Sequence, residues 1–107
     1  MSYRKEKLPE TLKQLAAEFI ERESGKASLI TVTGASISNN GQRVKILFTV
    51  LPENKEREAA SFIMRRKKDF AAFVDKRGRI GRMPQIEFSL DLGEKNRQRI
   101  EFLSKNE

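Results

Sequence analysis

The stretch Val44-Lys45-Ile46-Leu47-Phe48-Thr49-Val50-Leu51, which follows the turn sequence Asn39-Asn40-Gly41, sets the architecture of this chain. Successive residues of a strand point to opposite faces, so one face of this stretch is wholly apolar: Val44, Ile46, Phe48 and Val50. Asn and Gly tolerate the positive φ angles of tight turns. Because a β-rich run at 29–37 precedes the turn, the sequence predicts a β-hairpin.

The region before the hairpin carries the apolar spacing of an amphipathic helix. Its apolar residues recur at intervals of three and four and form one stripe: Leu8, Leu12, Leu15, Ala16, Phe19 and Ile20. Pro9 suits the first turn of a helix, and Gly25 supplies a stop signal. We therefore predict a first helix from about Pro9, or a few residues earlier, to Glu23.

Two further helical segments follow Pro52, which ends the second strand. Asn54 is a candidate N-cap, with Glu53 and Glu56 near the positive end of the helix. Four consecutive basic residues at 65–68 separate the apolar groups of the two segments. They cannot all point outward on one straight helix, whose residues advance about 100° each. The sequence therefore predicts a break or kink near residues 67–69.

The sequence pattern of the last third of the chain predicts one more strand and a short helix. Residues 85–90, after Pro84, alternate polar and apolar side chains, and we expect Ile100 and Leu103 to be the buried points of the helix. The order helix, strand, strand, helix, helix, strand, helix indicates a single α+β domain over residues 1–107. We expect residues 1–7 to form a mobile N-terminal tail and residues 103–107 to be frayed.

Positive charge is concentrated between residues 65 and 82. This segment holds eight basic side chains: Arg65, Arg66, Lys67, Lys68, Lys76, Arg77, Arg79 and Arg82. With only Asp69 and Asp75 against them, it carries +6 of the chain's formal net charge of +7. Such clustering is typical of a surface that binds nucleic-acid phosphates. The alternative is an ordinary solvated surface, because basic residues are mostly exposed in any protein.

The composition disfavours catalysis and tightly bound metals. The chain has no cysteine and no histidine, so thiolate and imidazole ligands, nucleophiles and bases are missing. We therefore predict no enzymatic activity, no catalytic residues and no metal or cofactor. The seven phenylalanines fall at positions that periodicity assigns to buried or partly buried faces. No apolar run approaches the roughly 20 residues of a membrane span, so we expect a cytoplasmic protein without a membrane partner, and we expect no small-molecule substrate. Because the surface is so highly charged, we expect a monomer.

Three stretches resemble the ribosome-binding factor A family, which acts in maturation of the bacterial small ribosomal subunit. They are residues 30–38 (Ile-Thr-Val-Thr-Gly-Ala-Ser-Ile-Ser), residues 43–51, and residues 83–91 (Met-Pro-Gln-Ile-Glu-Phe-Ser-Leu-Asp). The last is similar to the family's Pro-Glu-Leu-x-Phe…Asp signature and precedes a basic helix around Arg97 to Leu103. Each motif is short, and the specificity lies in their order and spacing.

This resemblance implies a type II KH-like fold, in which helices cover one face of a three-stranded sheet. It also implies a non-catalytic factor that binds ribosomal RNA of the immature small (30S) subunit and promotes late maturation and rRNA processing. The family joins its two middle helices at an Ala-x-Gly kink, whereas this chain has Lys67-Lys68-Asp69 there. Residues 78–81 read Gly-x-x-Gly, but they precede a strand, which favours a turn over a KH-type backbone clamp.

Two alternative functions stay open at this stage. One is a general KH-like nucleic-acid-binding domain that has no connection with ribosomes. The other is a protein-interaction module that uses its basic segment to bind an acidic partner, or that accepts a partner strand at a sheet edge. In each reading the eight basic residues between positions 65 and 82 are the candidate binding residues.

Overall fold

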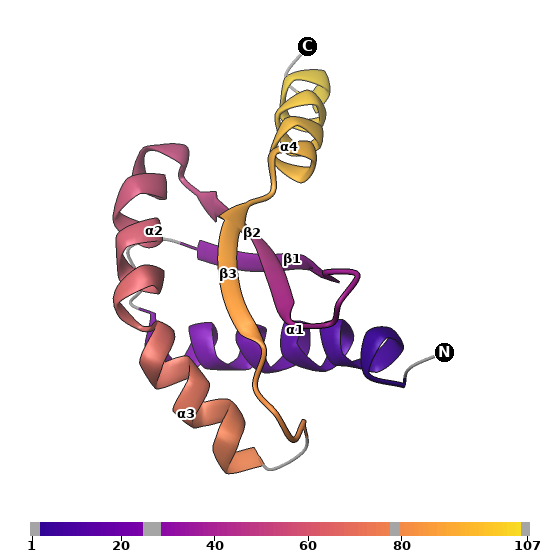
Figure 1. The fold of residues 1–107 in the computed structure, drawn as a ribbon. Coiled ribbons are helices and arrows are strands. Elements are labelled where there is room, and N and C mark those ends of the chain that lie inside the picture. The colour runs from indigo at the N-terminus through magenta and orange to yellow at the C-terminus, as the bar shows by residue number, and fades with distance from the viewer. Residues whose placement is uncertain (1–2, 25–28, 78–79, 106–107) are drawn as a thin grey trace.

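A computed structural model describes residues 3–24, 29–77 and 80–105 (Figure 1). Its elements are α1 (Tyr3–Glu23), β1 (Leu29–Ile37), β2 (Arg43–Leu51), the 3-10 turn η1 (Glu53–Lys55), α2 (Glu56–Arg65), α3 (Lys67–Arg77), β3 (Gln85–Leu90) and α4 (Leu92–Lys105). The strand order is β1-β2-β3. Because β1 runs antiparallel and β3 parallel to β2, the sheet is mixed. The predicted α+β class and order of elements are confirmed.

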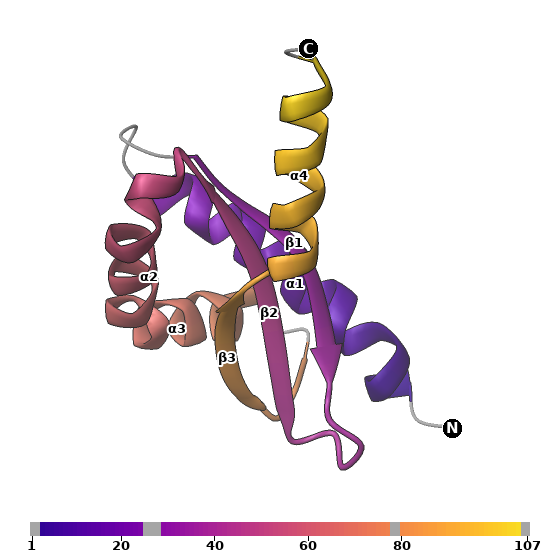
Figure 2. The same cartoon turned by 90° about the horizontal axis from the view of Figure 1, so that it is seen from above.

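The central strand β2 places its apolar face against the helices, as its alternation predicted. Val44 and Ile46 are fully buried, and Phe48 and Val50 are nearly so. They form one core with Leu12 and Ala16 of α1 and with buried residues of α2 and α3. Helices α1, α2 and α3 thus cover one side of the sheet, whereas α4 extends away from it at the end of β3 (Figures 1 and 2).

The predicted break between the middle helices is present at Arg66, one residue before the predicted range. Arg66 has φ −101° and ψ 5°, which separates α2 from α3. Its N–H donates to the carbonyl of Ile63 at 3.0 Å, and its own carbonyl accepts from the N–H of Phe70 at 2.8 Å. The kink lets both helices bury their own apolar residues, Ile63 on α2 and Phe70 on α3.

Both predicted chain ends differ from the structure. Helix α1 begins at Tyr3, so residues 3–7 are helical instead of forming a tail. Helix α4 is not short, because its 14 residues extend to Lys105 and include most of the segment that we expected to fray. Residues 1–2 and 106–107 lie outside the described residues.

Two side-chain predictions are also wrong. The side chains of Ile100 and Leu103 are 64% and 63% exposed instead of buried, because α4 extends away from the sheet (Figure 1). Asn54 caps no helix: it lies inside η1, and the caps at Pro52 and Lys55 involve no side-chain hydrogen bond.

The phenylalanines of the described part are core residues, as predicted. Phe19, Phe48 and Phe70 are buried, and Phe62, Phe73 and Phe88 pack partly buried around them. The ring centroids of Phe19 and Phe70 are 5.5 Å apart, and those of Phe70 and Phe88 are 5.7 Å apart. These separations suit tilted and edge-on aromatic contacts. The side chain of Phe102 lies outside the described residues.

A β-bulge in β1 connects the sheet to α4. The register passes from Val32 opposite Phe48 to Gly34 opposite Leu47, so Thr33 has no partner residue in β2. The Thr33 hydroxyl instead donates to Asp91 Oδ2 at 2.6 Å. Asp91 Oδ1 accepts from the N–H of Glu94 at 3.0 Å, which caps the first turn of α4. The bulge thereby links β1, at one edge of the sheet, to Asp91, which follows β3 at the other edge and caps α4.

These hydrogen bonds stabilise the charged form of Asp91. The hydroxyl of Thr33 makes the largest contribution, and the backbone N–H of Glu94 adds to it, so the pKa of Asp91 lies below its ordinary value. A depressed carboxyl pKa stabilises the fold above the pKa of the unfolded chain, about 3.9. This stabilisation disappears as the pH falls through the folded-state pKa.

Thr33→Val should lower the free energy of unfolding by about 1–2 kcal/mol at pH 7, because a hydrogen bond to a charged group is lost. Urea denaturation measures this, with Thr31→Val, an exposed position of the same strand, as the matched control. The difference between wild type and Thr33→Val should shrink as Asp91 becomes protonated below about pH 4. An equal loss in both variants, or a loss independent of pH, would contradict this role.

Candidate nucleic-acid interface

The eight basic residues that the sequence predicts to bind nucleic acid fall into groups with different surroundings in the structure. Four of them make no ion pair or hydrogen bond through their side chains within the described part of the chain: Arg65, Lys67, Lys68 and Lys76. Two others, Arg66 and Arg77, contact carboxylates. Arg82 is exposed on the segment that leads into β3. Arg79 lies outside the described residues.

Helix geometry explains why Lys68 and Lys76 are exposed. Phe70 and Val74 define the buried side of α3. At 100° per residue, positions 68 and 76 fall on the opposite side, whereas Lys67 lies closer to the core and is half-buried. Arg65, two residues after the buried Ile63 of α2, is exposed for the same reason. The predicted segment therefore offers solvent-facing cations from both middle helices.

Arg66 holds the kink against α1. Its Nη1 lies 3.3 Å from Glu23 Oε1, at the end of α1, and 3.3 Å from Asp69 Oδ2 in the first turn of α3. Its guanidinium also stacks over the ring of Phe62, with 5.4 Å between Cζ and the ring centroid. The positive charge of Arg66 is thus matched by two carboxylates, and the side chain links three helices.

Arg77 makes a corresponding contact at the other end of α3. Its Nη2 donates to Glu18 Oε1 of α1 at 2.6 Å, and its guanidinium lies 4.5 Å from the centroid of the Phe73 ring. Arg22 of α1 approaches the same ring, at 5.6 Å. Both ends of α3 are therefore attached to α1 by an arginine that sequence reasoning had assigned to RNA. The sequence carried no signal for this, because the carboxylates are 43 and 59 residues away.

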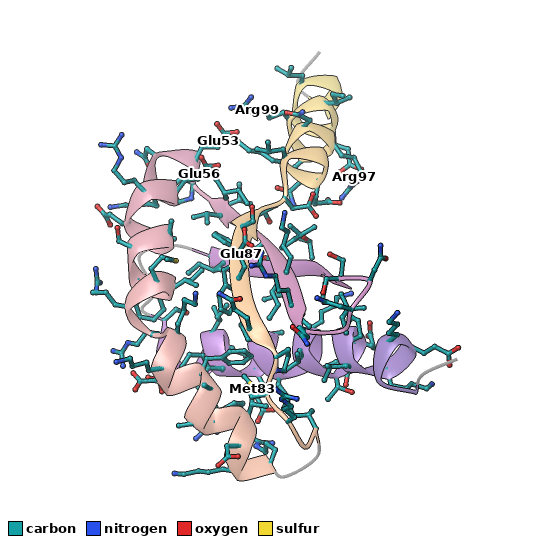
Figure 3. All side chains as sticks on the ribbon, viewed as in Figure 1. Glu53, Glu56, Met83, Glu87, Arg97 and Arg99 are labelled. Atoms are coloured by element: carbon teal, nitrogen blue, oxygen red, sulfur yellow. The ribbon has the colours of Figure 1, made fainter. Side chains whose placement is uncertain are left out.

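Helix α4 is fixed by ion pairs that the sequence analysis did not identify. Arg99 donates through Nε and Nη2 to the two carboxylate oxygens of Glu53, both at 2.6 Å, and Lys95 donates to Glu56 at 3.0 Å (Figure 3). Arg97 pairs with Glu94 within the helix. The hydrogen bonds from Arg99 lower the pKa of Glu53, and they raise the pKa of Arg99. The cations of α4 named here are therefore matched by carboxylates.

The segment that reads Gly-x-x-Gly makes a turn where it is described. Gly81 has φ +65°, a conformation that side-chain-bearing residues adopt rarely, and it precedes the strand β3 by a few residues. Gly78 and Arg79 lie outside the described residues. The described half of the segment therefore agrees with the predicted turn.

Among the described residues, no group of three or more acidic side chains is arranged to hold a metal ion. No helix in the described ranges is long and apolar enough to cross a membrane.

Arg77→Ala should destabilise the fold by about 1 kcal/mol, because it removes an inter-helix ion pair and a cation–π contact. Lys76→Ala, the matched control one residue earlier, should change the free energy of unfolding by less than about 0.5 kcal/mol. Chemical denaturation of both variants, together with a double-mutant cycle between Arg77 and Glu18, measures the coupling. Equal stability of the two variants would show that the contact contributes nothing.

The sequence and the fold were compared with known protein families and solved structures. A family model described as ribosome-binding factor A matches residues 4–104. The fold is similar to the crystal structure of ribosome-binding factor A from Thermus thermophilus, with a TM-score of 0.69 and 26% sequence identity, covering 80% of this chain and 93% of that chain. It is also similar to a Thermus thermophilus ribosome-binding factor A homology model fitted into a cryo-EM map of a 30S complex, with a TM-score of 0.65 and 26% identity, covering 76% of this chain and 88% of that one.

A search of curated proteins found no match. The family model nevertheless spans nearly the whole chain, and the fold shared with the Thermus protein has the order of helices and strands that the sequence predicted. This chain belongs to the ribosome-binding factor A family.

Proposed function

We propose that this protein is a non-catalytic assembly factor that binds ribosomal RNA of the immature small (30S) ribosomal subunit and promotes its late maturation and rRNA processing. The observation that carries the proposal is the family match over residues 4–104. A homology model of the Thermus ribosome-binding factor A, which is similar to this chain, has been fitted into a cryo-EM map of its complex with 30S. A net charge of +7 on 107 residues supports an RNA partner, and such a factor would act in the cytoplasm.

The RNA contacts are assigned to the cations of the basic segment that pair with no carboxylate among the described residues, of which Arg65, Lys68 and Lys76 face solvent and Lys67 is half-buried. Arg65, Lys67, Lys68 and Lys76 have no carboxylate competing for them in the described ranges, so their charge is available to phosphates. Arg79 and Arg82 continue the segment along the chain. Arg66 and Arg77 act as positioning residues, because they hold α3 against α1 and thereby orient the cations that α3 carries.

The kink has a charged composition that fits this role. Where the family has its Ala-x-Gly kink, this chain carries Lys67 and Lys68 directly after the break at Arg66. Lysine contributes a mobile point charge and no planar fork, so it favours phosphate attraction over readout of base edges. The described phenylalanines are core residues, which leaves recognition to phosphates and to RNA shape.

The protein needs no chemical step to act on the subunit. It would bind an assembly intermediate, hold a local RNA conformation, and leave when the mature structure no longer offers the same phosphate arrangement. Release requires only that the two RNA states differ in their affinity for the protein.

Replacing Arg65, Lys68 and Lys76 together by Ala should weaken binding to immature small subunits and reduce its salt dependence. Each lost phosphate contact lowers the slope of log K against log salt concentration by about 0.7–0.9. Three lost contacts should therefore reduce the slope by about 2 to 3. Co-sedimentation with purified immature and mature small subunits over a salt series measures both affinity and slope.

The matched control removes three cations elsewhere, Lys55, Arg57 and Arg97, and should leave the slope nearly unchanged. An unchanged slope in the first variant would overturn the assignment of the basic segment. Equal binding of the wild type to immature subunits, mature subunits and generic RNA would overturn the assembly-factor function and favour a general nucleic-acid-binding domain. Saturable binding to an acidic protein, with none to RNA, would favour a protein-interaction module.

A further inference from the structure

A polar groove of about 750 Å³ lies at the end of the sheet opposite α4. One wall is the turn of the β1–β2 hairpin, residues 40–43, and the other is residues 82–85, which lead into β3. Figure 3 shows Met83 at this end of the molecule, far from the ion pairs of Glu53 and Arg99 at the other end. Of the residues that line this groove, only Arg82 belongs to the basic segment that the sequence predicts to bind nucleic acid.

The lining of the groove is rich in hydrogen-bond donors and in positive charge. Arg43 and Arg82 contribute guanidinium groups, and three side chains contribute amides: Asn40, Gln42 and Gln85. No carboxylate is among the lining residues. Arg43 is exposed, and its side chain has no acidic partner within the described ranges. Such a surface suits an anion with several acceptor oxygens.

The next acidic residue along β3 does not neutralise the groove. Glu87 stands opposite Lys45 in the β2–β3 register, two residues beyond Gln85, and is not among the residues that line the groove. Arg43, in contrast, stands opposite the neutral Gln85. The charged side chains that line the groove are therefore both positive.

The hairpin wall is held in one conformation by its own hydrogen bonds. Asn40 Oδ1 accepts from the Ser38 hydroxyl at 2.7 Å and from the N–H of Gln42 at 3.0 Å. Because the amide oxygen of Asn40 is occupied, its NH₂ group is left as a donor. The Ser38 oxygen accepts in turn from the N–H of Arg43 at 3.1 Å. The Gln85 N–H donates to the carbonyl of Gln42 at 2.8 Å, which joins the two walls.

We propose that this groove is a second RNA-backbone site, in which Arg43 and Arg82 contact phosphates while the amides of Asn40, Gln42 and Gln85 donate to phosphate or ribose oxygens. The inference rests on the proposed function. It extends the RNA surface from the middle helices to the hairpin, which lies in a different part of the sequence. The preformed walls lower the ordering cost of binding.

Arg43→Ala tests the site, because Arg43 lies outside the core and outside the basic segment. Binding to purified immature small subunits should weaken about 3- to 10-fold, and the salt slope should fall by about 0.7–0.9, the value for one phosphate contact. Arg57→Ala, an exposed arginine in the first turn of α2, is the matched control and should change affinity less than about 2-fold, because it removes the same charge away from the groove. Arg43→Lys should restore most of the slope, because it keeps the charge.

The outcomes separate the two proposals. If the wild type binds immature subunits and Arg43→Ala behaves like Arg57→Ala, the groove inference is wrong and the proposed function stands. If the wild type shows no preference for immature subunits, the proposed function itself fails. Thermal unfolding of both variants should give equal midpoints, and a lower midpoint for Arg43→Ala alone would show that its binding defect is structural.

A photo-crosslinking amino acid at position 42 gives a second, independent readout. In complexes with immature subunits it should crosslink to ribosomal RNA nucleotides, and the same group at position 57 should not. Crosslinks to a ribosomal protein alone, or none at position 42 under conditions where the labelled protein binds, would overturn the assignment of this groove to RNA.

Discussion

The buried face of β2 holds the rest of this molecule together. Val44 and Ile46 are completely buried, and Phe48 and Val50 are 2% exposed. A fully buried side chain of this kind contributes about 1.5–3 kcal/mol. Because β2 is the central strand, β1 and β3 take their register from it, and α1, α2 and α3 bury their apolar residues on the same side. The positions of the hairpin groove and of the basic segment both follow from this one packed layer.

At the end of the sheet where α4 begins, polar contacts hold the elements together instead of apolar burial. The bulge at Thr33 turns a hydroxyl toward Asp91, and Asp91 caps α4, so a single carboxylate joins β1, β3 and α4. Beyond this cap, ion pairs from Arg99 and Lys95 to η1 and α2 hold the helix. Helix α4 therefore has a defined direction although its leucine and isoleucine side chains stay exposed.

The basic segment contains two kinds of cation that composition cannot distinguish, those paired with carboxylates and those without such a partner among the described residues. Arg66 and Arg77 form ion pairs with carboxylates of α1, and their guanidinium groups stack on Phe62 and Phe73. These contacts within the fold occupy part of each guanidinium group. Arg65, Lys68 and Lys76, on the outer side of the helices, have no carboxylate partner within the described residues, and we propose these cations as the phosphate contacts. Attachment at both ends of α3 fixes the backbone that carries Lys68 and Lys76 relative to α1, so the proposed phosphate contacts would require no rearrangement of the helices.

Local patterns in the sequence were sufficient for the order of elements, the hairpin, the buried face of β2 and the approximate position of the kink. Each depends on residues close together in the chain, through side-chain periodicity, turn-forming residues or the crowding of four cations. The net charge and its concentration between residues 65 and 82 likewise require only the sequence.

Tertiary structure alone decided which cations are matched by carboxylates and which surfaces come together. Arg66 and Arg77 find carboxylates 43 and 59 residues away, and Arg43 meets Arg82 across a groove made by distant segments. The exposure of Ile100 was also invisible to periodicity, because a helix shows an apolar stripe whether or not another element covers it. Contacts between distant segments depend on how the layers pack, and no local pattern encodes them.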